Sequence, residues 1–292
     1  MNSIPFRHML LLFLLLGACT SLSPASTATP SPLPPSGPGA GFRYSTYGAP
    51  DNLGPDYWVS VGERMAAKFP EAHPEIIWIV GNVFGEGTYL SFHEESEDPL
   101  IYSGYADMNE AILTKFDERG FKVWLQVEPG KADMETLIHL SMAQYKHHPS
   151  VIGFGVDVEW YKSVSGPLGE PITDEEAKHW VEAVRSHGEH YQLFLKHWEV
   201  DWMPPTYRDG IVFVNDSQQF ESLDAMLANF KDWGDTFAPA PVGYQYGYPS
   251  DKVWWKELQD PPGDIGRTLL ENIPNTSALF WVDFSILDAF PP

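Results

Sequence analysis

The 292-residue chain contains little of three things, namely cysteine, basic side chains and long apolar runs. Its single cysteine excludes any disulfide within the chain. The 18 Lys and Arg residues stand against 40 Asp and Glu residues, and this excess of acid argues against nucleic acid or an anionic lipid surface as the partner. The longest apolar run, residues 9–16, is too short to cross a bilayer as a helix.

Several catalytic motifs are also absent. No G-x-G-x-x-G follows the first expected strand, and H-E-x-x-H, G-x-S-x-G and a phosphate-binding loop do not occur. The ten histidines are scattered, and His147 and His148 are expected to cap the C-terminus of a helix. We therefore expect neither a metal nor a cofactor. Asp157, Glu159 and Asp283 could hold Ca²⁺ or Mg²⁺, but no loop motif supports such a site.

The N-terminus has the pattern of a secretory signal, with Arg7 before the apolar run and small residues up to Cys19. The segment Leu16-Gly17-Ala18-Cys19 also resembles the bacterial lipobox, in which the cysteine carries the lipid. This resemblance implies a signal peptide over residues 1–18 and lipidation of Cys19. It further implies a lipoprotein of the cell envelope that faces outside the cytoplasm and meets the membrane only through this anchor.

Residues 20–41 are almost wholly Ser, Thr, Pro, Gly and Ala, a composition that cannot bury enough apolar surface to fold. We therefore expect the lipidated cysteine and a linker over residues 19–41. The remaining residues, 42–292, have about the usual length of one (β/α)8 barrel.

Apolar, β-rich runs alternate with helical patterns through this domain. The expected strands are 42–48, 75–83, 122–128, 151–159, 191–198, 211–217, 242–248 and 278–285. Helices with readable caps are expected at 107–120, after Asp133, at 173–188 and after Ser222, with capping boxes at Asp107/Glu110 and Thr173/Glu176. Eight strands alternating with helices predict an α/β protein, a single-domain (β/α)8 TIM barrel.

A two-residue period predicts which side chains enter the barrel. In strand 151–159 the odd positions point inward, so that the strand ends with Asp157 and Glu159 at the C-terminal mouth, where this fold builds active sites. The outward positions of the four strands with a clear phase are Ile152, Phe154, Val156, Val158, Val123, Leu125, Val127, Leu193, Leu195, Phe280, Val282 and Phe284. The resulting mouth contains Asn82, Gln126, Glu128, Asp157, Glu159, Lys196, Trp198, Asn215, Gln245, Tyr246, Trp281 and Asp283.

Indoles beside amides and carboxylates suit a carbohydrate, which offers apolar C–H faces and hydroxyl groups. Cleavage of a glycosidic bond also requires a carboxylic acid with a raised pKa. Glu159 is the candidate acid/base, because the like charge of Asp157 and nearby indoles both disfavour its ionisation. Glu128 could be its partner carboxylate. Lys196 is expected to balance these charges rather than to form a Schiff base.

The strand also resembles family 18 glycoside hydrolases, the chitinases and endo-N-acetylglucosaminidases. Gly153-Phe154-Gly155-Val156-Asp157-Val158-Glu159 matches the glycine and the final D-x-E of the D-G-x-D-x-D-x-E motif, while Ile152 and Gly155 replace two of its aspartates. The resemblance implies that Glu159 is the general acid and that Asp157 orients an N-acetyl group of the substrate. It also implies that Trp281 floors the sugar subsite and that Tyr246 contacts the acetamido group.

Two hypotheses follow for the domain. The first is a glycoside hydrolase that acts on a polysaccharide, possibly an N-acetylated one. The second is a barrel lipoprotein that binds glycans or peptidoglycan fragments without cleaving them. In the second case the missing aspartates of the motif mark lost chemistry. A purely structural interpretation of Asp157 and Glu159, as an interior ion pair with Lys196, also stays open.

Overall fold

The computed structural model describes residues 37–163, 166 and 169–292. The expected signal peptide, Cys19 and most of the linker lie outside the described residues. The first strand begins at Gly39, so it includes the last residues that the sequence analysis assigned to the linker. Among the described residues no helix is both long and apolar enough to span a membrane.

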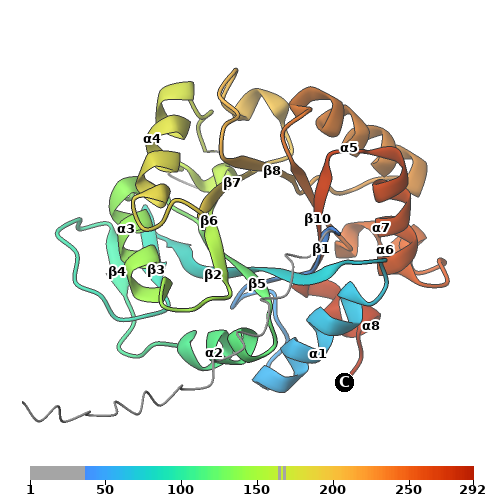
Figure 1. Ribbon diagram of the computed structural model, residues 1–292, viewed down its shortest axis with the longest axis horizontal. Helices are drawn as coiled ribbons and strands as arrows, with labels where there is room; N and C mark the ends of the chain where they lie inside the picture. The colour runs from blue at the N-terminus through green and yellow to red at the C-terminus, as the bar shows by residue number, and fades with distance from the viewer. Residues whose placement is uncertain (1–36, 164–165, 167–168) are drawn as a thin grey trace, which may run out of the picture. The chain divides into compact units, whose positions relative to one another are not determined.

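Eight parallel strands form a closed ring, which confirms the predicted (β/α)8 barrel (Figure 1). Each strand pairs with the next, and the ring closes because the first strand pairs with both the second and the last. The strands are β1 (Gly39–Tyr44), β2 (His73–Phe84), β5 (Lys122–Val127), β6 (Val151–Asp157), β7 (Gln192–Lys196), β8 (Ile211–Asn215), β9 (Val242–Tyr246) and β10 (Thr276–Val282).

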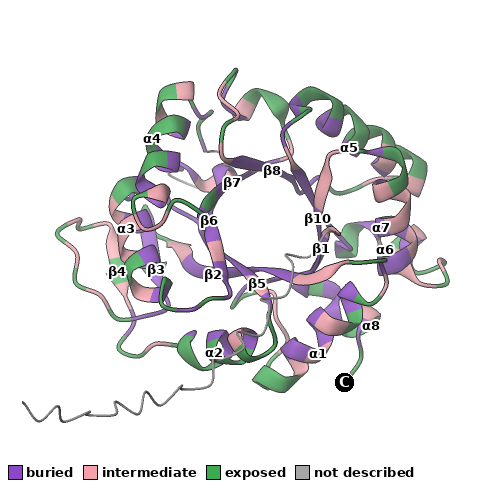
Figure 2. Ribbon diagram, in the orientation of Figure 1, coloured by how far each residue is buried: buried purple, intermediate pink, exposed green. Residues whose placement is uncertain are grey.

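Helices surround the ring, and their buried faces turn toward it (Figure 2). They are α1 (Pro55–Ala66), α2 (Glu110–Glu118), α3 (Met134–Tyr145), α4 (Asp174–Arg185), α5 (Leu223–Phe237), α6 (Lys252–Trp255), α7 (Pro261–Asn272) and α8 (Ile286–Ala289). Two short strands, β3 (Gly87–Leu90) and β4 (Ile101–Ser103), extend the sheet beside β2 and were not predicted.

The helix caps are largely those that the sequence predicts. Thr173 and Glu176 form a complete capping box at the start of α4, and Asp133 and Ser222 cap α3 and α5. The prediction for α2 was wrong by two residues, since its N-cap is Asn109. Asp107 instead accepts hydrogen bonds from the backbone N–H groups of Asn109 and Glu110, at 2.8 and 3.1 Å.

Large side chains fill the inside of the barrel, and β6 makes room for them with glycine. The rings of Trp124 and Phe194 meet edge to face with centroids 5.5 Å apart. A Cβ atom on Gly155 would lie 2.0 Å from Cζ of Phe194, and one on Gly153 would lie 2.5 Å from the Trp124 ring. The aspartate that the family 18 motif places at position 155 therefore has no space beside Phe194.

The predicted phase holds on β5, on β7 and on β6 from Gly153 onward. It was wrong at the start of β6, where Ile152 packs against the interior cluster and Val151 does not, because the pairing with β5 shifts register there. It was also wrong on β10, where Phe280 faces the interior and Trp281 packs against the outer helices. Both faces of β10 are apolar, so alternation carried no information about its phase.

We expect Gly155→Ala to lower the free energy of unfolding by about 1–3 kcal/mol, because the added methyl group overlaps the Phe194 ring. Phe194→Leu removes the atoms that it would strike. Urea unfolding of both single variants and of the double variant measures the coupling between the two sites. The double variant should lose less stability than the sum of the single losses, and simple additivity would show that Phe194 does not fill this space.

Candidate active site

A cavity of about 380 Å³ opens at the C-terminal ends of the barrel strands. Every strand of the ring contributes to its wall, either directly or through the residues that follow it. The lining residues are Arg43, Tyr47, Asn82, Val83, Glu128, Glu159, Trp160, Lys196, Trp198, Asp216, Gln218, Tyr248 and Phe284. The cavity is therefore in the place where barrels of this class build their sites, and its size suits a small ligand or a few sugar units.

The floor of the cavity is organised by the ammonium group of Lys196. Its Nζ atom lies 2.9 Å from Oδ2 of Asp157, 4.0 Å from Oε1 of Glu159 and within hydrogen-bonding distance of Asp216. The three carboxylates come from the ends of the neighbouring strands β6 and β8, on either side of Lys196 on β7. One ammonium cannot neutralise three carboxylates, so this arrangement favours retention of a proton.

The carboxyl groups of the floor have shifted pKa values. Burial raises the pKa of Glu159, and although Lys196 opposes this shift, Asp216 and Glu128 add to it. Burial likewise raises the pKa of Asp157, against Lys196 and together with Glu159. The side chain of Asp157 is only 1% exposed, whereas that of Glu159 is 19% exposed and lines the cavity. Glu159 is therefore the protonatable group that a ligand can reach.

Lys196 itself remains charged. Burial alone would lower the pKa of its ammonium, but Asp157 and Asp216 hold that pKa well above its usual value. A Schiff base requires the neutral amine, so this environment disfavours covalent catalysis by Lys196. The ammonium also occupies the place between the carboxylates that a metal ion would need.

A second network fixes Glu128, which follows the neighbouring strand β5. One of its oxygens accepts a hydrogen bond from the Tyr47 hydroxyl, and the other accepts one from the backbone N–H of Val83 at 3.0 Å. Arg43 donates to Tyr47 and, at 2.7 Å, to the buried carboxylate of Asp283. The network joins β1, β2, β5 and the turn after β10, so closure of the ring itself sets the position of Glu128.

Aromatic side chains and free polar atoms complete the cavity. Tyr47, Trp160, Trp198 and Phe284 supply apolar wall. Within the described part of the chain, Nδ2 of Asn82 and Oδ1 of Asp216 are buried without a hydrogen-bond partner. Buried polar atoms are rarely left unpaired, so hydrogen bonding at these two cavity residues is incomplete.

The predicted mouth residues separate into three groups. Those that line the cavity are Asn82, Glu128, Glu159, Lys196 and Trp198. Those buried beneath it are Asp157, Gln126, Gln245 and Asp283, of which Gln126 donates to Asp157 at 3.3 Å and Gln245 accepts from Tyr248 at 3.2 Å. Those outside the barrel interior are Trp281, Tyr246 and Asn215.

The placement of the third group corrects the sequence analysis. Trp281 is completely buried against Tyr246 and Trp255, and the Tyr246 hydroxyl donates to the backbone oxygen of Pro262. Neither ring reaches the cavity, so the expected subsite floor is not formed by Trp281. Asn215 turns toward α5, where its side chain donates to Asn229 at 3.4 Å. The next residue, Asp216, lines the cavity where the sequence analysis expected Asn215.

Sequence reasoning missed eight residues of the cavity wall, which lie at strand ends and in loops. They are Arg43, Tyr47, Val83, Trp160, Asp216, Gln218, Tyr248 and Phe284. Asp216 had a usable signal, because it directly follows an apolar strand at the barrel mouth. The others lie at strand ends and in loops whose direction alternation does not predict.

Comparisons with known proteins show the fold. No protein-family description and no curated protein matches the chain. A solved structure from Bacteroides thetaiotaomicron, described as a candidate alpha-L-fucosidase, has 9% identity and a TM-score of 0.52, over 93% of this chain and 95% of that one. An endocellulase from Pyrococcus horikoshii has 11% identity and a TM-score of 0.50, over 83% of each chain. At such identities the likeness shows the shared barrel alone.

We expect Glu159→Gln to stabilise the protein at high pH. Because the pKa of Glu159 is raised on folding, the folded state keeps a proton that the unfolded chain releases, and stability falls as pH rises from 4.5 through the raised value. Glu159→Gln has no carboxyl group at this position, so its free energy of unfolding does not fall in this way as pH rises. Its free energy of unfolding should exceed that of the wild type at pH 8, and the difference should be smaller at pH 4.

Urea unfolding at pH 4 and pH 8 measures this difference. The exposed Glu221→Gln is the matched control, and it should change stability little at either pH. A Glu159→Gln variant that is less stable than the wild type at pH 8, or a gap that does not depend on pH, would contradict the raised pKa.

Proposed function

We propose that this protein is a glycoside hydrolase that cleaves glycosidic bonds of a polysaccharide, with Glu159 as the general acid. The observation that carries this proposal is the environment of Glu159, whose carboxyl group is mostly buried, has a raised pKa and still lines the cavity. A carboxylic acid in this state can protonate the oxygen of a leaving sugar. The cavity walls of indole and tyrosine rings suit the C–H faces of sugar rings.

Glu128 is the second carboxylate in this proposal. It faces the same cavity as Glu159 and is held apart from Lys196 by its bonds to Tyr47 and Val83. Such fixed bonds keep a carboxylate in one position, where it can act either as nucleophile or as base toward water. The anomeric configuration of the first product distinguishes these two roles.

Asp157 acts through Lys196 rather than on the substrate. It is almost fully buried, accepts from Gln126 and Lys196, and does not line the cavity. The role that the family 18 resemblance implies for Asp157, contact with an N-acetyl group, would require the side chain to move. We therefore propose a carbohydrate substrate without requiring an N-acetyl group, and a substrate panel should contain both kinds of glycan.

The barrel folds of the fucosidase-like and endocellulase structures support this proposal at the level of fold. The place of action that we propose is the cell envelope, reached through a lipid on Cys19. This part of the proposal rests on the resemblance of Leu16–Cys19 to a lipobox, in residues outside those that the structure describes.

We expect Glu159→Gln to reduce hydrolysis of polysaccharides by about 10²- to 10⁴-fold, since the variant cannot donate the proton. The loss should be much smaller on aryl glycosides with acidic leaving groups, which depart without protonation. Glu128→Gln should lose activity on both substrate types. Release of reducing ends from a broad glycan panel, and release of the aryl group, measure the two activities.

The exposed Glu221→Gln serves as the control and should keep wild-type rates. If the wild type cleaves no glycan of the panel but binds some of them, and Glu159→Gln binds equally well, the hydrolase proposal fails. That result would favour the alternative function, a barrel that binds glycans without cleaving them.

Substitutions of Trp198 and Trp281 test where the sugar binds. Trp198→Ala should weaken glycan binding at least tenfold, because it removes cavity wall. Trp281→Phe should lower stability but leave affinity unchanged, because Trp281 is buried outside the cavity. Titration calorimetry and urea unfolding measure these effects. A loss of affinity confined to Trp281→Phe would restore Trp281 as the subsite floor.

A further inference from the structure

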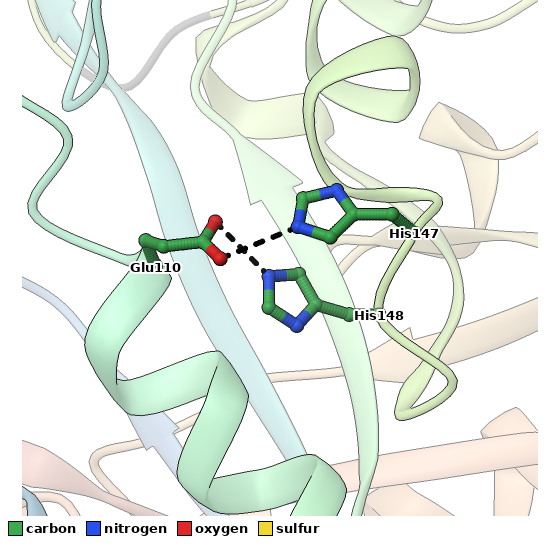
Figure 3. Close-up of side chains that lie close together, drawn as sticks. All are labelled: Glu110, His147 and His148. Atoms are coloured by element: carbon green, nitrogen blue, oxygen red, sulfur yellow. Dashed lines mark hydrogen bonds and ion pairs between the residues drawn. The ribbon is translucent and has the colours of Figure 1, made fainter.

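A second cluster of polar side chains lies on the outer flank of the barrel. Glu110 is the first residue of α2, and His147 and His148 lie in the turn between α3 and β6, 37 residues or more away along the chain (Figure 3). None of the three lines the cavity of the candidate active site. Both histidine rings point their Nε2 atoms at the Glu110 carboxylate, as Figure 3 shows.

The distances within the cluster are compatible with a metal ion held between the three residues. Nε2 of His147 lies 3.3 Å from Oε1 of Glu110, and Nε2 of His148 lies 3.2 Å from Oε2. Charge-assisted hydrogen bonds of this kind are usually about 2.7–2.9 Å long. In a tetrahedral zinc site with bonds of about 2.0–2.2 Å, neighbouring ligand atoms lie roughly 3.3–3.5 Å apart. One ligand atom from each residue can be chosen so that all lie within 4.8 Å of one another.

The orientation of His148 gives an independent reason. Its Nδ1 atom lies 2.6 Å from Oδ2 of Asp117, and a carboxylate there accepts the Nδ1 proton. Asp117 is itself held in place, since its other oxygen accepts the backbone N–H of Ser150 at 2.9 Å. With Nδ1 turned toward Asp117, Nε2 is the nitrogen of His148 that faces Glu110 and His147, and it is the atom that can bind a metal.

We propose that Glu110, His147 and His148 bind a divalent transition metal, with zinc as the metal that best suits two imidazole nitrogens and one carboxylate oxygen. Asp117 orients His148 in the way that carboxylates commonly orient metal-bound histidines. His148 is buried, while the side chains of His147 and Glu110 are 56% and 48% exposed, so water can complete the coordination. The metal would join α2 to the turn before β6, and it would take no part in the proposed hydrolysis of glycans.

The test is a titration of zinc into the full-length protein after exhaustive removal of metals. The wild type should bind one zinc ion per chain at this site, and its melting temperature should rise with zinc concentration. Titration with cobalt should give the intense visible absorption of a tetrahedral site. His147→Gln and Glu110→Gln should each weaken binding at least tenfold and abolish the thermal shift. The exposed side chain of His147 makes loss of folding an unsuitable explanation for that variant.

His179→Gln is the matched control, because His179 also forms an exposed pair with a glutamate, at 2.9 Å from Glu135. Its zinc affinity should equal that of the wild type. Failure of the wild type to bind zinc would overturn the proposal and leave the cluster as two histidines that pair with Glu110. Binding that persists in His147→Gln and Glu110→Gln, or that is lost in His179→Gln, would place the metal elsewhere and would equally overturn it.

Discussion

The ammonium group of Lys196 is the interaction on which the candidate site depends. It lies between Asp157 and Asp216, so it joins the ends of three adjacent strands, and it is buried with both partners. Removing one partner of a buried ion pair usually costs about 3–5 kcal/mol, so the ends of β6, β7 and β8 are held firmly. The same charge limits how far the pKa of Glu159 rises, because it partly offsets the effect of burial. The Lys196 ammonium therefore both holds the strand ends together and limits the rise in the pKa of Glu159.

The layer beneath this ammonium explains why β6 differs from the motif that it resembles. Phe194 and Trp124 fill the barrel at the level of Gly153 and Gly155, and a side chain at either glycine would overlap a ring or the neighbouring backbone. In this barrel, apolar packing occupies the space that the family 18 motif gives to an aspartate. Carboxylates appear only above the rings, at Asp157 and Glu159. The absence of an aspartate at position 155 thus has a steric cause, and the last two acidic positions of the motif are the ones that face the mouth.

Two networks provide the two carboxylates of the proposed mechanism with different surroundings. Glu159 lies 4.0 Å from Lys196, which also contacts two other carboxylates. Glu128, in contrast, accepts hydrogen bonds from Tyr47 and from the backbone of Val83. Arg43 and Asp283 extend the second network across the junction of β1 and β10. Pairs of titratable groups with contrasting environments are typical of acid/base catalysis. In the proposed zinc site, a metal would balance the charge of Glu110 as the Lys196 ammonium balances the carboxylates at the barrel mouth.

The sequence by itself determined the barrel, the caps of α3, α4 and α5, and the inward positions of β5, β7 and most of β6. Those strands have polar or glycine residues on one face, so a two-residue period distinguishes inside from outside. Strand β10 is apolar on both faces, and only the packing of its neighbours decided that Phe280 enters the barrel and Trp281 does not. Tyr47, Trp160 and Asp216 reached the cavity through turns after the strands, and Glu110 met His147 and His148 across 37 or more residues. Such contacts depend on how separate elements pack against one another, which no local pattern contains.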